Sequence, residues 1–270
     1  MGGRGEDETA RGAVSFVRTG APPVIAIVTA VPLEARAIAR RLRGGRRVPS
    51  PVGGAWEGRL GGAAVRLLCA GMGPHRADIA VRALLADLRE PPAMLLSAGL
   101  AAGLDPHLAI GDVIGAIEIV GPDERIRCAP HPPVPGVGAA TLTATNRVLV
   151  TPQEKAALRA ASGAAAADME SLTLARAAQA AGIPFLAIRA ISDAASDRLP
   201  LDFEACRDRA GDLDMRRLLL RLLQRPTALP ALLRFAGGCR HAANRLAQAI
   251  ERMLADYQVM RDQARTCRRD

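Results

Sequence analysis

Three carboxylates lie where an α/β protein would present them to a ligand. Glu34 and Glu170 each fall in the first turn of a predicted helix, and Asp193 closes the apolar run Phe185–Ile191. Because ligands of open α/β sheets bind beyond the carboxyl ends of strands, these groups are candidates for proton transfer and for holding hydroxyl groups. Taken singly, each is also explained as a helix-dipole partner or a turn former.

Two glycine-bearing segments follow strands of the same predicted sheet. Gly71 and Gly73 lead from a strand into a helix that begins at Pro74, and Gly99 lies in the segment Ala98–Gly103 after the next strand. We expect both segments to be turns, in which backbone amides approach an anion or a sugar. They lack the third glycine of a dinucleotide-binding fingerprint, so on their own they indicate only that a strand meets a helix.

The other reactive side chains form no catalytic or metal-binding pattern. Ser97 and Ser171 lack the G-x-S-x-G frame of an α/β-hydrolase. The five cysteines are widely spaced and form no C-x-x-C pair: Cys69, Cys128, Cys206, Cys239 and Cys267. The histidines have no metal-like spacing: His75, His107, His131 and His241. We therefore expect no metal, no cofactor and no disulfide scaffold.

Alternating strands and helices must position the candidate groups. Short apolar runs predict five buried strands: Val24–Thr29, Ala63–Ala70, Ala93–Ala98, Val113–Val120 and Phe185–Ile191. Apolar residues three and four apart predict three helices: Pro32–Leu42, Pro74–Leu88 and Glu170–Ala181. This alternation predicts an α/β sheet with helices on both faces. We expect a last domain helix near Phe203–Leu223 and a proline-rich loop at Arg125–Val137.

The net charge of +9 is concentrated at one end of the 270-residue chain. From Arg216 onward there are 12 arginines and 4 acidic residues, so the preceding part is nearly neutral. A module that binds nucleic acid would place aromatic residues among these basic ones, and this region has only Phe235 and Tyr257. We therefore expect no nucleic-acid partner, although a basic interaction module stays an alternative.

The chain divides by composition into three parts. Residues 1–20 are expected to be a flexible N-terminus without a signal peptide, residues 21–224 a single domain, and residues 225–270 a basic amphipathic helical tail. No run is apolar enough to span a membrane, and a cytoplasmic location is expected. The helix Leu229–Tyr257 has one apolar face, which would pack on protein or lie on the inner surface of the membrane.

The joint pattern from about Pro23 to Leu223 resembles the nucleoside phosphorylase and nucleosidase superfamily. The matching stretches follow the order of that superfamily: Val28–Glu34, Ala70–Gly73, Ser97–Leu104, Ile110–Val113, Asp168–Glu170 and Arg189–Asp193. The match is closest to the branch acting on adenine nucleosides, the branch of the methylthioadenosine and adenosylhomocysteine nucleosidases. The resemblance implies a single-domain nucleoside phosphorylase-like fold, with a central mixed sheet flanked by helices and followed by the helical tail.

Finer features resemble the hopanoid-associated phosphorylase group. They are Thr151–Leu158, Asp168–Ser171, Arg198–Pro200 and Leu229–Leu233. That resemblance implies release of adenine from adenosylhopane during hopanoid synthesis, with a lipid-linked nucleoside as substrate and membrane-surface contact through the tail. The alternative is a cytosolic nucleosidase acting on methylthioadenosine or adenosylhomocysteine. A homodimer is expected from the resemblance to nucleosidases.

The resemblance also implies roles for individual residues. Asp193 would be the acid that protonates adenine N7, Glu170 would accept hydrogen bonds from the ribose hydroxyls, and Met169 would pack on the sugar. Glu34 matches the position that activates water in nucleosidases. Further substrate-binding residues would be Gly71, Gly73, Gly99 and Ser192.

Two positions depart from the superfamily pattern. Leu100 stands where many relatives have Ser or Thr, and Ser97 stands where hexameric phosphorylases have a phosphate-binding Arg. Glu34 therefore favours hydrolysis, whereas the closest group implies phosphorolysis with inorganic phosphate as co-substrate. Both reactions stay open at this point.

Overall fold

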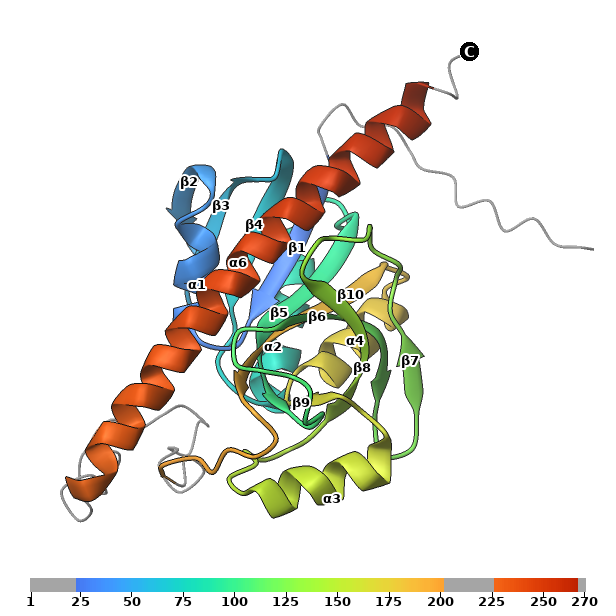
Figure 1. Cartoon of the computed structure of the whole chain (residues 1–270). Helices are drawn as coiled ribbons and strands as arrows, with labels where there is room; N and C mark the ends of the chain where they lie inside the picture. Colours follow the sequence, from blue (N-terminus) through green and yellow to red (C-terminus); the bar gives the residue numbers. More distant parts are fainter. Residues whose placement is uncertain (1–22, 202–225, 267–270) are drawn as a thin grey trace, which may run out of the picture.

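A mixed sheet of ten strands forms the centre of the protein, seen here in a computed structural model that describes residues 23–201 and 226–266 (Figure 1). The strands are β1 Val24–Thr29, β2 Arg43–Val48, β3 Ala55–Leu60, β4 Ala63–Cys69, β5 Met94–Gly103, β6 Val113–Val120, β7 Arg125–Arg127, β8 Val137–Ala144, β9 Ala166–Asp168 and β10 Phe185–Asp193. The helices are α1 Pro32–Ala39, α2 Pro74–Asp87, α3 Pro152–Ser162, α4 Ser171–Ala180 and α6 Leu229–Thr266, with a 3-10 turn at Pro226–Ala228.

Part of the sheet closes on itself. The strand order is β10-β6-β8-β9-β5-β1-β4-β3-β2, and β10 also pairs with β5, so the first five strands form a ring. The pairings of β1 with β4, of β1 with β5 and of β5 with β10 are all parallel. The carboxyl ends of these four strands therefore meet at one edge, which is where ligands of α/β sheets bind.

The core has two layers because side chains alternate along each strand. On β1, Ala26 and Val28 join the cluster covered by α2 and α4, whereas Ile25 and Ile27 join the cluster covered by α1 and α6. Apolar runs such as β1 are therefore buried on both faces, with helices on each side of the sheet as expected. This is the predicted mixed α/β architecture.

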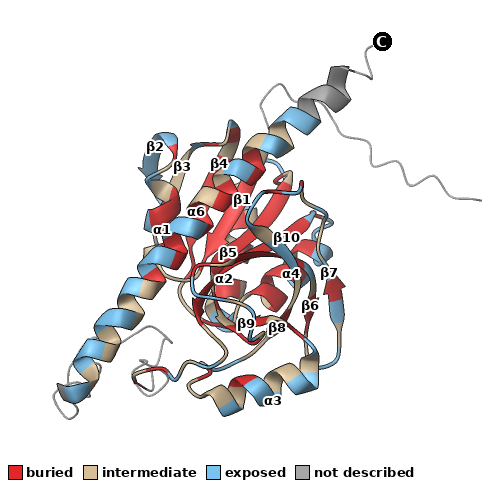
Figure 2. Cartoon of the chain, in the orientation of Figure 1, coloured by how far each residue is buried: buried red, intermediate tan, exposed pale blue. Residues whose placement is uncertain are grey.

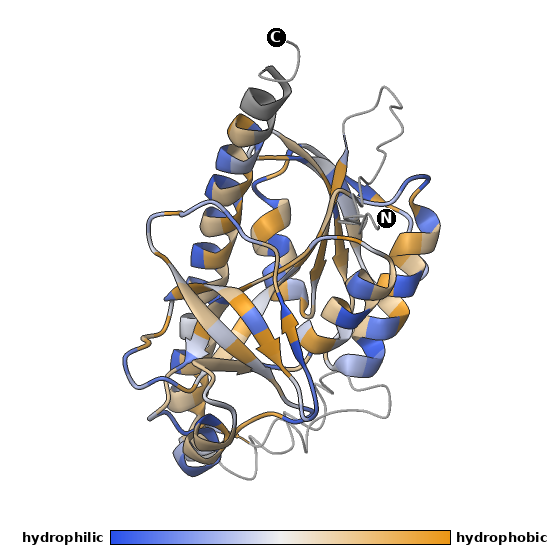
Figure 3. Cartoon of the chain, turned by 90° about the vertical axis from the view of Figure 1, so that its right-hand side faces the viewer, coloured by the Kyte–Doolittle hydropathy of each residue, from blue (hydrophilic) through white to orange (hydrophobic). Residues whose placement is uncertain are grey.

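The long helix α6 belongs to the second layer of this core. It contacts α1, β5 and β10, and Figure 2 shows its buried residues in the middle of the helix with more exposed turns toward both ends. The buried face consists of Cys239, Ala242, Ala243, Leu246, Ala247, Ala249, Ile250, Met253 and Leu254. Hydrophilic residues lie along its outer side (Figure 3). The apolar face, which we expected to pack on protein or to lie on a membrane, packs on the sheet and on α1.

The other differences from the sequence-based expectations concern polar or short strands. Ala98–Gly103 is the second half of β5, not a turn, and β7 lies within the segment expected to be a loop. Strands β2, β3 and β8 were not predicted because they lack a continuous apolar run, and β9 was not predicted because it has only three residues. Helix α3 was not predicted either. The expected flexible N-terminus, the helix near 203–223 and the boundary at residue 224 lie outside the described residues. In the described ranges, no helix is both long and apolar enough to cross a lipid bilayer.

Candidate active site

Glu34 is fixed by backbone amides from the segment after β1 and from the neighbouring strand β5. Pro32 begins α1 directly after β1, so the Glu34 carboxylate turns back and accepts hydrogen bonds from Ala30 N and Val31 N, both 2.9 Å away. Its other oxygen accepts from Leu100 N of β5 at 2.8 Å. Glu34 is only 3% exposed. Burial raises the pKa of its carboxyl, against the opposing effect of these amides.

Gly99 is needed for this close approach. A Cβ atom at this position would lie 3.2 Å from Glu34 Oε1 and 3.5 Å from its carboxyl carbon. The expected role of Gly99 in bringing backbone near the site therefore has a geometric basis, although Gly99 lies in a strand. The amide used is that of the next residue, Leu100, so the departure from Ser or Thr at this position leaves the contact to Glu34 intact.

Glu170 lies between β9 and α4 and meets the start of α2. Its Oε1 accepts a hydrogen bond of 2.6 Å from Gly73 N. Gly73 has a φ of 93° and Gly71 one of 94°, values that favour glycine, so this turn matches the prediction. The carboxyl is withdrawn from water, which together with the negative charge of Asp168 raises its pKa to about 7. Met169, beside it, is half-buried.

Asp193 ends β10 at an irregularity in the pairing with β5. The register shifts between Ile191 and Asp193, and such a bulge re-aims the side chains beside it. Asp193 Oδ1 accepts from Ser192 Oγ at 2.6 Å, and Oδ2 lies 2.5 Å from Lys155 Nζ. Burial raises the pKa of the Asp193 carboxyl, and the positive charge of Lys155 opposes that rise. Ser192 therefore contacts the candidate acid directly.

Arg189 and Asp168 form a buried ion pair next to the motifs that carry the candidate carboxylates. Arg189, 2% exposed, pairs with Asp168 and donates hydrogen bonds to Ser97 Oγ at 2.6 Å and Ser171 Oγ at 2.7 Å. Its Nη1 also donates to Ser97 O at 2.8 Å. This cluster joins β5, β9, α4 and β10. The sequence offered one signal for it, an arginine in the middle of the apolar run Phe185–Ile191.

Helix α6 contributes to the same region. Burial, followed by the negative charges of Asp193 and Glu34, raises the pKa of the Cys239 thiol to about 12. A Cβ at Gly238, the preceding residue, would lie 3.7 Å from Ser192 O. Glu34 in turn is close enough to Glu170 to raise its pKa. The charge of Glu34 therefore acts on Glu170, and the charges of Glu34 and Asp193 both act on Cys239 of α6.

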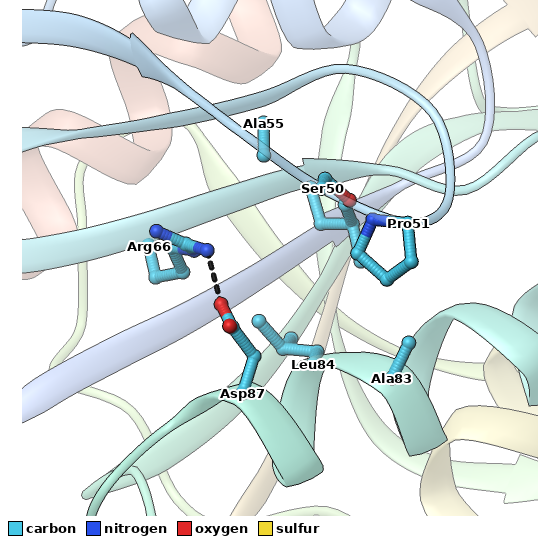
Figure 4. A pocket seen from close by; sticks show the side chains of 8 residues that line it. Ser50, Pro51, Ala55, Arg66, Ala83, Leu84 and Asp87 are labelled. Atoms are coloured by element: carbon cyan, nitrogen blue, oxygen red, sulfur yellow. Dashed lines mark hydrogen bonds and ion pairs between the residues drawn. The ribbon is translucent and has the colours of Figure 1, made fainter.

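A separate hollow between β4 and α2 contains none of these groups. It is lined by Ser50, Pro51, Ala55, Arg66, Leu68, Ala83, Leu84 and Asp87 (Figure 4). Arg66 there pairs with Asp87 and with Glu57, so its charge is compensated within the fold. Across the described residues, no three His, Cys, Asp or Glu side chains are grouped to hold a metal ion. The carboxylate cluster is the best candidate for a reacting centre.

The partly closed sheet and the carboxylates near its strand ends can be compared with known families. The profile of the Phosphorylase superfamily matches residues 24–145 and 138–224. The chain therefore belongs to the phosphorylase superfamily and is an enzyme of this nucleosidase and phosphorylase kind.

Individual relatives agree with this membership. A 5'-methylthioadenosine/S-adenosylhomocysteine nucleosidase of Glaesserella parasuis is 27% identical over 177 residues, which are 55% of this chain and 76% of the relative. The nucleosidase of Neisseria meningitidis, solved with methylthio-immucillin-A, has a TM-score of 0.65 at 17% identity, covering 87% of this chain and 99% of its own. Futalosine hydrolase of Helicobacter pylori has a TM-score of 0.63 at 15% identity, covering 87% and 98%. These two solved structures share the fold.

Proposed function

We propose that this enzyme cleaves the N-glycosidic bond of an adenine nucleoside and releases adenine. The observation that carries the proposal is a set of three carboxylates with different partners, of which Glu34 and Asp193 are buried and Glu170 is partly buried. The partners are backbone amides at Glu34, an amide and a neighbouring acid at Glu170, and a lysine at Asp193. Carboxylates whose surroundings differ in this way take different parts in acid–base chemistry. The nucleosidase of Glaesserella parasuis supports adenine as the base.

Breaking this bond leaves negative charge on the base and positive charge on the ribose. Asp193, whose pKa is raised by burial, is the acid that protonates the leaving base. Glu170 accepts hydrogen bonds from the ribose hydroxyls, and Met169 beside it packs on the sugar. Gly71 and Gly73 shape the turn that holds Glu170 through the Gly73 amide.

Hydrolysis is the form of the reaction that we favour. Glu34 is held in a fixed position by two amides beyond the end of β1 and one amide of β5, as a group that orients water must be. Arg189 is occupied by Asp168, Ser97 and Ser171, so it is not available to bind phosphate. The test is adenine release in phosphate-free buffer with mass analysis of the sugar product. A free sugar is expected, and a ribosyl phosphate formed only with added phosphate would contradict hydrolysis.

For the substrate, we propose adenosylhopane. The support is the resemblance of Thr151–Leu158 and Leu229–Leu233 to the hopanoid-associated group. The alternative substrates are methylthioadenosine and adenosylhomocysteine, which the name of the Glaesserella parasuis relative favours. The experiment compares kcat/KM for adenine release from all three nucleosides. Preference for adenosylhopane supports the first proposal, and preference for either small nucleoside supports the alternative.

Membrane contact is proposed for the first turns of α6 only, because its later apolar face is covered. Leu229 is 43% exposed, Leu233 is 63% exposed, and the adjacent Arg234 is also exposed. Such residues suit a surface of anionic lipid. Wild type is expected to sediment with anionic vesicles at low salt, and Leu233→Glu to sediment less. The expected homodimer is tested separately, by light scattering in solution.

A further inference from the structure

Lys155 is the single lysine of the chain, and it is fully buried. Its Nζ donates to Ala194 O at 2.6 Å and Asp197 O at 3.1 Å, and it lies 2.5 Å from Asp193 Oδ2. The two carbonyl oxygens accept hydrogen bonds from the ammonium group, and the Asp193 carboxylate forms an ion pair with it. All three partners belong to the segment that begins with Asp193. Lys155 therefore makes every polar contact of its side chain with the end of β10 and the turn after it.

The N-terminal cap of helix α3 fixes the turn from which the Lys155 side chain extends. Thr151 caps the helix by accepting from Glu154 N at 3.2 Å, while the Glu154 carboxylate accepts from Thr151 N at 2.9 Å. Pro152 fixes the first turn. The Glu154 carboxylate also pairs with Arg147 and accepts from Val150 N. Arg147, followed by the amides of Thr151 and Val150, lowers the pKa of Glu154 to about 2. The first turn is therefore rigid where Lys155 leaves the helix, and Lys155 is its only buried residue.

Lys155 is the one cation among the described groups that influence the pKa of Asp193. Ser192 donates a hydrogen bond to Asp193, and Asp197 adds negative charge from the following turn. Cys239 faces it from α6 as a neutral thiol, because burial raises the pKa of that thiol to about 12. Desolvation and the negative charge of Asp197 favour the protonated acid, whereas Lys155 and, more weakly, the hydrogen bond from Ser192 favour the ionised carboxylate.

We propose that Lys155 is the positioning residue of the candidate acid, holding the Asp193 carboxyl in place and stabilising the carboxylate that remains after proton transfer. In that step the electron pair of the N-glycosidic bond passes to the base, and the proton of the Asp193 carboxyl passes to a nitrogen of the base. The carboxylate left behind is paired with the Lys155 ammonium, which keeps its own protons. This inference rests on the proposed function, because it assigns Lys155 a part in the same reaction.

The kinetic test compares Lys155→Met and Lys155→Arg with wild type. Without the cation, the Asp193 carboxyl holds its proton more tightly, so the basic limb of the kcat/KM profile should move up by about one to three pH units. We expect kcat for Lys155→Met to fall by about 100-fold, with KM changed much less. Lys155→Arg keeps the charge and should keep the basic limb near its wild-type position. Arg159→Met is the matched control, since Arg159 is a cation of the same helix that pairs with Asp105 instead.

A second measurement needs no turnover. Because the chain has one lysine, protein labelled with ¹³C-lysine gives a single Cε resonance. In wild type this resonance should shift as Asp193 titrates, and the shift should be absent in Asp193→Asn. A basic limb that stays in place in Lys155→Met, or a Cε signal that is identical in wild type and Asp193→Asn, overturns the role of Lys155. If adenine is released but neither the basic limb nor the Cε signal behaves as expected, only the role of Lys155 is overturned. If the Cε signal depends on Asp193 but no adenine is released, only the proposed function is overturned.

Discussion

Asp193 carries the sharpest prediction at the scale of single residues. Asp193→Asn keeps the shape of the side chain and an oxygen for the Ser192 hydroxyl, but it has no proton to give to the base. We expect adenine release to fall by about 10²- to 10⁴-fold with the thermal midpoint nearly unchanged. Asp105→Asn is the control, since Asp105 is a surface partner of Arg159. Full activity in Asp193→Asn would remove Asp193 from the mechanism.

Glu170 gives a prediction about pH. Its carboxyl has a pKa raised from 4.5 to about 7, so the protonated form is favoured in the folded state. Its stabilising contribution is present below pH 4.5 and is lost as the pH rises through about 7. Glu170→Gln, which keeps an oxygen for the Gly73 amide, should therefore have a thermal midpoint less sensitive to pH over this range. Identical slopes of midpoint against pH for wild type and variant would contradict the raised pKa.

The sequence pointed to the three candidate carboxylates but not to the buried cations near them. Glu34, Glu170 and Asp193 were recognisable because they stand at strand ends within recognised motifs. Lys155 and Arg189 lie within such motifs, but the sequence does not indicate their role, because the partners of a charged residue become visible only when segments distant in sequence come together. Arg189 meets Ser97 across 92 positions of the chain, and no local pattern predicts that contact.

At the scale of elements, β5 shows how a strand can be taken for a turn. Its second half is rich in glycine and alanine, a composition typical of turns, yet it pairs with β10 as far as Ala102. Neighbouring strands on both sides override its weak strand propensity. Small residues are used here because Glu34 approaches the strand closely at Gly99.

Gly99→Ala tests that approach. The added Cβ would lie 3.2 Å from Glu34 Oε1, which is tighter than usual and would push the carboxylate from its amides. We expect stability to fall by about 1 to 3 kcal/mol and kcat to fall with it. Gly138→Ala is the control in another strand, because its nearest neighbour would be 3.8 Å away. A Gly99→Ala enzyme with wild-type kcat would show that the position of Glu34 does not matter for the reaction.

At the scale of the whole molecule, the two-layered α/β architecture could be predicted from periodicity, whereas the surface on which α6 packs could not. The apolar face of α6 was visible in the sequence, but an amphipathic pattern does not reveal which surface it covers. The structure shows it on the sheet beside α1.

The contribution of α6 to the free energy of unfolding can be measured by shortening a buried side chain of this helix. Ile250, at 0% exposure, lies in the core layer with α1. Ile250→Ala should lower the free energy of unfolding by about 2 to 5 kcal/mol. Leu233→Ala, in an exposed turn of the same helix, should change it by about 0.5 kcal/mol or less. Equal small effects in chemical denaturation would mean that α6 is not part of the domain's core.

The place of α6 in the chain has a consequence for biosynthesis. All ten strands precede it, so a ribosome delivers the complete sheet before the helix that covers one of its apolar faces. Until residues 239–254 emerge, the nascent protein exposes Ile25, Ile27 and their neighbours to other chains. Messages truncated before α6 should therefore yield insoluble product in cells. Chaperones that bind apolar surface should stay bound to the nascent chain until α6 has been synthesised.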